Sequence, residues 1–282
     1  MSTSAVGPAA AGAALWGRQV LSILRLEVRK AFLGRRLIGV YLLALAPVLL
    51  LGARAVLTLG PRGAGNMGQA GIVFAGLFQL FILRIAIFFG CVAIFTNLFR
   101  GETLEKTLHF YLLSPVRREV LVAGKYLAGL AAAAVLFVAS TALSFWLLYV
   151  PYGSDALSRY FFAGPGLQQI GAYMGVALLA CVGYGAVFTL TGLWVRNPMI
   201  PAAVIMVWEG SNFFLPALFQ KLSVIHYLQS LCPVALPAEP LAILVEPTPA
   251  WVSVPGLLAV TALVMVLAGL RIRRSEITYS TD

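Results

Sequence analysis

The sequence predicts an all-α, polytopic membrane protein with six transmembrane helices, and three observations support that class. Of the 282 residues, 61% are hydrophobic and only 11% are charged, whereas soluble domains are about half apolar and about a quarter charged. The apolar residues gather in runs of about 20 or more, the length that crosses a bilayer as a helix. Most basic residues lie in short segments between these runs. A bilayer is therefore the solvent that suits this chain.

The predicted spans are the long apolar runs that polar or turn-rich segments separate. They cover residues 37–59, 70–98, 121–149, 167–195, 199–219 and 251–270. Together with their connections they form one predicted transmembrane domain over 37–270. The stretch 220–250 contains Pro233, Pro237 and Pro240. Because prolines interrupt helices, we expect short broken helices there instead of a further span.

Both ends of the chain are predicted to lie outside the spans. Residues 1–14 are rich in Ala, Gly and Ser, and we expect them to be disordered. Residues 15–36 place apolar side chains at helical spacing with basic residues between them, which is typical of an amphipathic helix in the membrane interface. The alternative is a basic anchor that only fixes topology. Residues 271–282 are polar and are expected to form a short cytoplasmic tail.

The distribution of Lys and Arg predicts the orientation. Arg84 lies inside the second predicted span; of the other basic residues, fifteen fall on the N-terminal side of the membrane and four on the opposite side. The four are Arg54, Arg62, Arg159 and Lys221. Because cytoplasmic loops carry the excess of Lys and Arg, both termini are expected in the cytoplasm. The sequence shows no cleavable signal and no transit signal, so we expect a multi-pass protein of the cell inner (plasma) membrane.

One polar segment on the cytoplasmic side is unusual for its length. Residues 97–125 read NLFRGETLEKTLHFYLLSPVRREVLVAGK. Its apolar residues at helical spacing include Leu104, Leu108 and Tyr111. Ser114-Pro115 ends the run, because the residue before a proline avoids the helical region. We therefore expect a short amphipathic helix over about 102–113, lying crosswise at the cytoplasmic face.

The order of residues in this segment has a parallel in a known family. In chain order it contains Glu102, Glu105, Thr107-Leu108, Leu112-Leu113-Ser114-Pro115, Arg117-Arg118 and Gly124-Lys125. This order resembles the loop after the second span in permease subunits of ATP-binding-cassette exporters of the type-2 class, which export drugs, polysaccharides and lipids. The six-span order of the whole chain is also similar to that class. The stretch 220–250 resembles its extracellular re-entrant helices.

The resemblance implies that the helix at about 102–113 is a coupling helix that docks in a cleft of a separate ATPase subunit. The implied coupling residues are Glu102, Thr103, Leu104, Glu105, Lys106, Thr107, Leu108, Tyr111, Ser114 and Pro115. The apolar members would fill the cleft and the charged members would contact its rim. The resemblance further implies a second permease subunit, either another copy of this chain or a related one. ATP and Mg would bind to the ATPase and not to this chain.

The sequence contains no motif for catalysis or metal binding. The patterns GxxxxGK[ST], HExxH and GxSxG are absent, so no phosphate loop, zinc site or nucleophile elbow is expected. His109 and His226 are far apart, and Cys91, Cys181 and Cys232 form no CxxC pair. The basic residues form no single patch, which argues against a nucleic-acid partner. We expect a non-catalytic chain that binds no cofactor itself.

Two charged residues lie inside predicted spans, Arg84 in LFILRIAIFFG and Glu209 in IMVWEGSNFF. A charge at the centre of a bilayer is costly, so both should face protein or water instead of lipid. Either they line a translocation path or pair with each other at a subunit interface, or they form a structural ion pair or reach toward the membrane surface.

These observations together predict a permease that moves a substrate across the membrane with ATP hydrolysed by a partner. The alternative is a secondary transporter or a channel, a class that favours internal repeats and broken helices. A membrane-embedded enzyme would need a cluster of polar residues at one depth, and two charges do not supply it.

Overall fold

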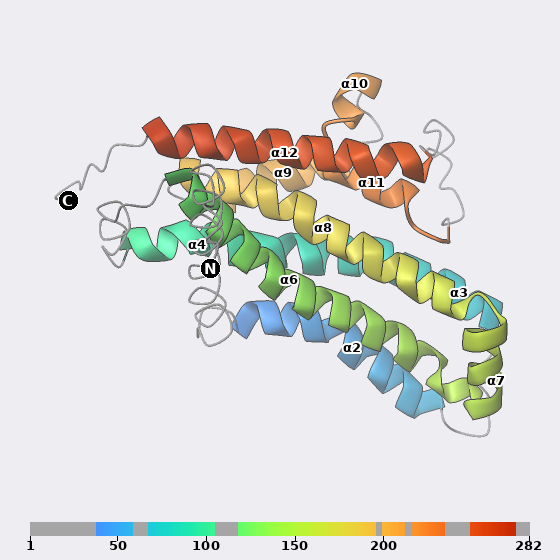
Figure 1. The fold of residues 1–282 in the computed structure, drawn as a ribbon. Helices are drawn as coiled ribbons and strands as arrows, with labels where there is room; N and C mark the ends of the chain where they lie inside the picture. The colour runs from blue at the N-terminus through green and yellow to red at the C-terminus, as the bar shows by residue number, and fades with distance from the viewer. Residues whose placement is uncertain are drawn as a thin grey trace, which may run out of the picture.

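A computed structural model describes residues 38–58, 67–104, 118–195, 199–211, 216–234 and 249–274. Every element over these residues is a helix, and the long helices lie side by side with their axes along a common direction (Figure 1). In chain order the elements are α2 (Ile38–Thr58), α3 (Met67–Gly76), the π-helix η2 (Leu77–Ile87), α4 (Phe88–Leu104), α6 (Arg118–Tyr149), η3 (Val150–Tyr152), α7 (Ser154–Ser158), η4 (Arg159–Ala163), α8 (Gly166–Trp194), α9 (Met199–Gly210), α10 (Ala217–Gln220), α11 (Val224–Ser230) and α12 (Ala250–Arg274).

Five helical stretches in this part of the chain are long and apolar enough to cross a membrane. They are Ile38–Thr58, Met67–Leu98, Glu119–Tyr152, Gly166–Trp194 and Ala250–Arg273. The second stretch joins α3, η2 and most of α4 without a non-helical residue. At a rise of about 1.5 Å per residue, even the shortest stretch spans the hydrocarbon core of about 30 Å. The helical membrane class predicted from the sequence therefore agrees with the structure.

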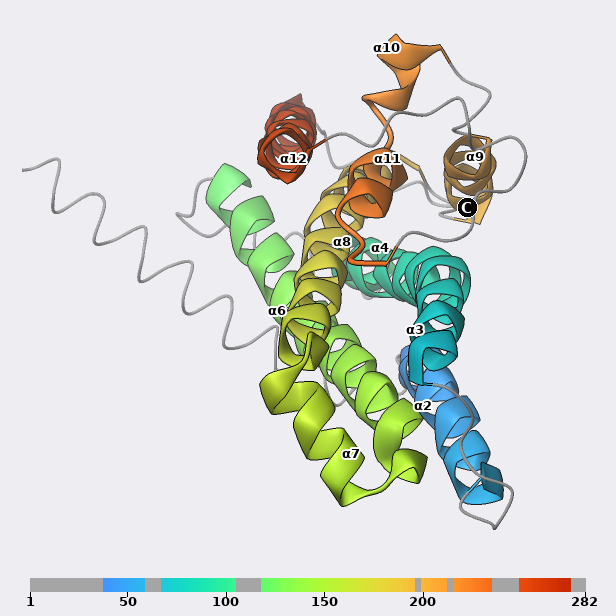
Figure 2. The ribbon, with the colours of Figure 1, turned by 90° about the vertical axis from the view of Figure 1, so that its right-hand side faces the viewer.

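Helix α8 lies at the centre of the bundle and packs against α4, α6 and α12 (Figure 2). In an apolar stretch of 18 residues within α8, 61% of the residues are buried. The corresponding shares are 28% for α2 and 22% for α12. The two outer helices therefore leave most of their apolar surface for lipid or for another protein.

Glycines let the central helices approach closely. A Cβ atom added to Gly185 of α8 would lie 2.5 Å from Cζ of Phe95 in α4. A Cβ atom added to Gly90 of α4 would lie 2.1 Å from Cζ of Phe137 in α6. Real Cβ atoms do not come this close to another carbon, so each ring occupies space that only glycine leaves free. Close packing of this kind is how helices associate in a solvent as apolar as their own side chains.

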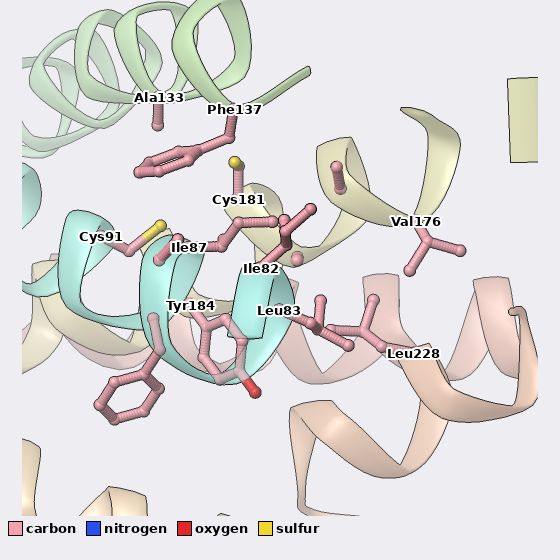
Figure 3. Packing of buried hydrophobic residues seen from close by; sticks show 14 of the residues in the cluster. Ile82, Leu83, Ile87, Cys91, Ala133, Phe137, Val176, Cys181, Tyr184 and Leu228 are labelled. Atoms are coloured by element: carbon pink, nitrogen blue, oxygen red, sulfur yellow. The ribbon is translucent and has the colours of Figure 1, made fainter. Parts of the chain in front are cut away.

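The buried core continues along the bundle into η2 and α11. Leu83 of η2, Val176 of α8 and Leu228 of α11 belong to one buried cluster, which Figure 3 shows from close by. Further along, the ring of Tyr173 lies 4.9 Å from that of Phe74 in an edge-to-face contact. The short α11 is therefore part of the packed core and not a surface loop.

The fifth predicted span, 199–219, is not one continuous helix in the structure. Helix α9 ends at Gly210 after 12 residues, or about 18 Å, which is too short to cross the core of a bilayer. The next described helix, α10, begins after Pro216, whose ring lacks the N–H that continues a helix from the preceding turn. In both views α10 lies outside the group of long helices (Figure 1, Figure 2).

Helix α11 runs antiparallel to α12 and packs deep in the bundle. At its start, Val224 lies against Gly183 of α8 and Leu257 of α12. At its end, the hydroxyl groups of Ser230 and Ser253 are 2.8 Å apart and share a hydrogen bond. Since α11 adds about 10 Å to the 18 Å of α9, the two half-helices together have about the length of one span. The structure therefore does not confirm a continuous fifth span over 199–219.

Two helix ends differ from the sequence prediction. Helix α4 continues through Gly101 to Leu104, so residues 102–104 extend α4 and do not begin a separate helix. A glycine inside a helix costs only about 1 kcal/mol relative to alanine, too little to force a break here. Helix α12 continues to Arg274, past the predicted end at residue 270, because arginine is a good helix former.

Several predicted segments lie outside the described residues. They are the disordered tail 1–14, the interfacial helix 15–36, the remainder of the coupling helix after residue 104, and most of the C-terminal tail, 275–282.

Candidate functional site

Glu209, the penultimate residue of α9, is buried and accepts four hydrogen bonds. Its Oε1 accepts from the backbone N–H of Val224 at 3.0 Å. Its Oε2 accepts from the N–H of Ile225 at 2.8 Å and from the hydroxyl of Ser223 at 3.0 Å. The hydroxyl of Tyr184 donates a longer bond of 3.3 Å to the same oxygen. All four donors belong to α8 or to the start of α11.

These bonds explain how a carboxylate is accommodated among apolar helices. The first N–H groups of any helix lack partners within it, and the aligned peptide dipoles favour negative charge at that end. In α11 those N–H groups are satisfied by Glu209 instead of by the side chain of Ser223, which makes no capping bond to the backbone. The carboxylate therefore ties the end of α9 to the start of α11 across the break.

Arg84 is the other charged residue inside a span, and its surroundings are different. It lies in η2, near the middle of the Met67–Leu98 stretch. Its Nε atom is buried and has no hydrogen-bond partner within the described residues, and the contacts of Glu209 do not include it. The hydroxyl of Tyr184 lies within electrostatic range of the guanidinium. Arg84 and Glu209 thus share Tyr184 as a neighbour without forming an ion pair.

The helix that carries Arg84 has an unusual geometry. Residues 77–87 form a π-helix, which widens the backbone relative to the α-helices on either side, and π-helical turns occur frequently at functional sites. Gln79 in this stretch is buried and donates a hydrogen bond of 3.2 Å to the carbonyl of Val234, beyond α11. The π-helix therefore contacts the chain just beyond α11, the helix whose start is bound by Glu209.

At the opposite end of α4, polar contacts connect the helices that flank the coupling segment. Lys125 of α6 is fully buried, and its Nζ donates a hydrogen bond of 3.0 Å to the carbonyl of Leu98 in α4. At the start of α6, Glu119 forms a salt bridge with Arg273 near the end of α12. Helices α4 and α6, which lead into and out of the segment 105–117, are therefore joined to each other, and α6 is joined to α12.

The structure describes only part of the predicted coupling site. Glu102, Thr103 and Leu104 form the last turn of α4. The remaining predicted coupling residues lie outside the described residues, and they are Glu105, Lys106, Thr107, Leu108, Tyr111, Ser114 and Pro115. What the structure does place is the pair of helix ends from which this segment departs.

Sequence reasoning missed the partners of Glu209 and the burial of Lys125. Ser223 precedes the apolar run of α11, a typical helix-start signal, and it could have suggested a helix N-terminus near a carboxylate. Nothing in the sequence pairs that start with Glu209, fourteen residues earlier, or with Tyr184 in another helix. Lys125 lies seven residues after the start of α6, and no local pattern indicates that its side chain is buried.

No family model matches this chain, and no curated protein matches it. Over the described residues, no group of three or more His, Cys, Asp or Glu side chains is arranged to hold a metal ion. The candidate site therefore rests on the intramembrane charges, the broken helix and the joined helix ends.

Proposed function

We propose that this chain is the transmembrane permease subunit of an ATP-binding-cassette exporter, and that a separate ATPase subunit hydrolyses the ATP that drives transport. The observation that carries the proposal is the segment 97–125, whose order of acidic, Thr-Leu, Leu-Leu-Ser-Pro, basic and Gly-Lys residues resembles the coupling loop of that class. The chain has no phosphate loop of its own, so energy from ATP must enter through a contact with another subunit.

The joined helix ends support this proposal mechanically. An ATPase docked on the segment 105–117 would act on the end of α4 and the start of α6. Lys125 fastens these two ends together, and the Glu119–Arg273 bridge adds α12. Movement of the segment would therefore be transmitted to three helices as one body, as rigid-body switching between access states requires.

The broken helix also fits the proposed class. If α9 and α11 form one interrupted crossing, they and the five long helices would make the six crossings of the proposed class. Six crossings are half of the pathway in this class, so a second permease subunit is part of the proposal. The basic distribution supports cytoplasmic termini on the inner (plasma) membrane.

A second candidate, a secondary transporter, is favoured by one specific observation. Such transporters place substrate and ion sites at discontinuous helices near the middle of the bilayer, and the break after Gly210 carries a buried carboxylate there. In this chain, however, Glu209 is bonded to the backbone of α11 and to two hydroxyl groups. A coupling ion would have to displace those donors.

Co-purification tests which candidate is right. We would isolate the tagged protein from its own cells in mild detergent and identify bound proteins by mass spectrometry. The comparison is wild type against the triple variant Leu104→Asp, Leu108→Asp and Tyr111→Asp. A phosphate-loop ATPase should accompany the wild type and be lost from the variant, because charges in apolar cleft contacts oppose docking.

The control carries three aspartates at exposed positions of α7 and η4, at the other end of the bundle: Ser154→Asp, Phe162→Asp and Ala163→Asp. It should retain the ATPase. If no ATPase accompanies the wild type, the permease proposal is wrong and the secondary transporter becomes the leading candidate.

A further inference from the structure

Arg84 occupies a position where a positive charge without a counter-charge is costly in free energy. It lies near the middle of the Met67–Leu98 stretch, about as far from either surface of a bilayer as a side chain can be. The residue is half-buried, and Leu80, one turn before it, is 60% exposed. This part of η2 therefore borders the outside of the bundle, and the Arg84 side chain is partly exposed.

The described chain supplies no counter-charge for Arg84. Its Nε has no partner, and the one carboxylate inside an apolar span, Glu209, already accepts four hydrogen bonds. The other nine acidic residues fall at the ends of predicted spans or outside them, and they are Glu27, Glu102, Glu105, Glu119, Asp155, Glu239, Glu246, Glu276 and Asp282. A second copy of this chain brings the same ten acidic residues.

The chemistry of the guanidinium selects the kind of ligand that would supply the charge. Arginine presents a planar fork of N–H donors that matches the two oxygens of a carboxylate or phosphate. The nearby surface includes an aromatic pair, since Phe88 lies one turn away and packs on Tyr184 with ring centroids 5.3 Å apart. A ligand that satisfies both features has an acidic group and a hydrophobic body.

We propose that Arg84 binds the acidic group, phosphate or carboxylate, of an amphipathic substrate that this chain carries across the membrane. Transport of that substrate rests on the proposed permease function, whereas its binding at Arg84 does not. The uncompensated cation, the π-helix around it and the exposed border at Leu80 are the observations that support this site.

The test measures binding and needs no ATP. The protein, with any subunits that remain bound, is placed in nanodiscs of neutral lipid and titrated with two matched pairs of probes. Dioleoyl phosphatidic acid is compared with dioleoylglycerol, and oleate with oleyl alcohol. The wild type should bind at least one anionic probe about tenfold or more tightly than its neutral analogue, because a charge-assisted bond in an apolar site has that value.

Three variants make the result specific. Arg84→Gln should abolish the preference for the anionic probe, and Arg84→Lys should keep only part of it, since lysine retains the charge without the fork. Arg159→Gln removes an exposed arginine of η4 and should leave the preference unchanged. If Arg84→Gln fails to fold, the preference of the wild type and its reduction in Arg84→Lys decide the question.

Several results would overturn the inference. They are equal binding of anionic and neutral probes by the wild type, an unchanged preference in Arg84→Gln, and displacement of phosphatidic acid by inorganic phosphate, which would indicate a site for free anions. If the preference depends on Arg84 but no ATPase accompanies the protein, the site stands and the permease proposal falls. If the ATPase is bound and the preference is absent, the permease proposal stands and the binding site at Arg84 falls.

Discussion

Glu209 and Arg84 are both charged residues among apolar helices, but the chain treats them differently. Glu209 is 8% exposed and meets four donors, two of them backbone N–H groups at the start of a helix. Among the described residues, the buried Nε of Arg84 has no hydrogen-bond partner. A buried charge whose bonds are complete holds the structure together, and one whose bonds are incomplete is available to a ligand. Four substitutions test this difference, from the largest expected effect to the smallest.

Replacement of the carboxylate should be the most damaging change. In Glu209→Ala, the first N–H groups of α11 and two hydroxyl groups lose their acceptor in a region without bulk water. We expect a loss of about 3 kcal/mol or more in the free energy of unfolding, measured by denaturation in detergent. Glu209→Gln keeps one carbonyl acceptor and should lose less. Unchanged stability in Glu209→Ala would contradict the assigned role.

Lys125 offers a buried cation that does have a partner. Lys125→Met keeps most of the side-chain volume but removes the charged hydrogen bond to the carbonyl of Leu98. We expect a loss of about 1.5 kcal/mol in the same measurement. A stability equal to or greater than that of wild type would show that this bond does not fasten α4 to α6.

The hydroxyl of Ser223 contributes one of the bonds to Glu209. Ser223→Ala removes that donor and leaves the two backbone bonds in place, so the loss should be about 1 kcal/mol. The double variant with Glu209→Ala should cost clearly less than the sum of the two single changes, because both act on one bond. Additive losses would mean that the two side chains act independently.

Removal of the bare cation should have the smallest effect on stability. Arg84→Leu replaces a guanidinium whose Nε has no hydrogen-bond partner in the described part of the chain with an apolar side chain. We expect a change within about 0.5 kcal/mol or a small gain. The measurement is thermal unfolding in the absence of added lipid. A loss as large as that of Glu209→Ala would show that Arg84 is a structural residue and would remove the contrast between the two charges.

Features with a local signal could be predicted from the sequence. The five long helices follow from apolar runs such as Ile38–Thr58 and Gly166–Trp194, because length and apolarity alone decide that a segment prefers lipid. The two intramembrane charges were identified in the same way. The position of each along its span was also readable, since depth follows from residue number.

Features that depend on contacts between distant residues could not be predicted. The apolar run 199–219 looks continuous, but α9 ends at Gly210. The hydrogen bonds from Glu209 to the start of α11 stabilise the interrupted helix, and they join residues that are distant in sequence. The extension of α4 past Gly101 was missed because a glycine next to charged residues looks like a boundary. Neither the acceptor at Leu98 for Lys125 nor the bridge from Glu119 to Arg273 has a signature within one helix.

The central claim is that a separate ATPase docks on the cytoplasmic segment after α4, and site-specific cross-linking tests it most directly. A photo-reactive amino acid replaces Leu108 in cells, and a second strain carries it in place of Phe162, at the other end of the bundle. After illumination, the account predicts a covalent adduct between position 108 and a phosphate-loop ATPase, and none from position 162. No ATPase adduct from position 108, or equal adducts from both positions, would contradict it.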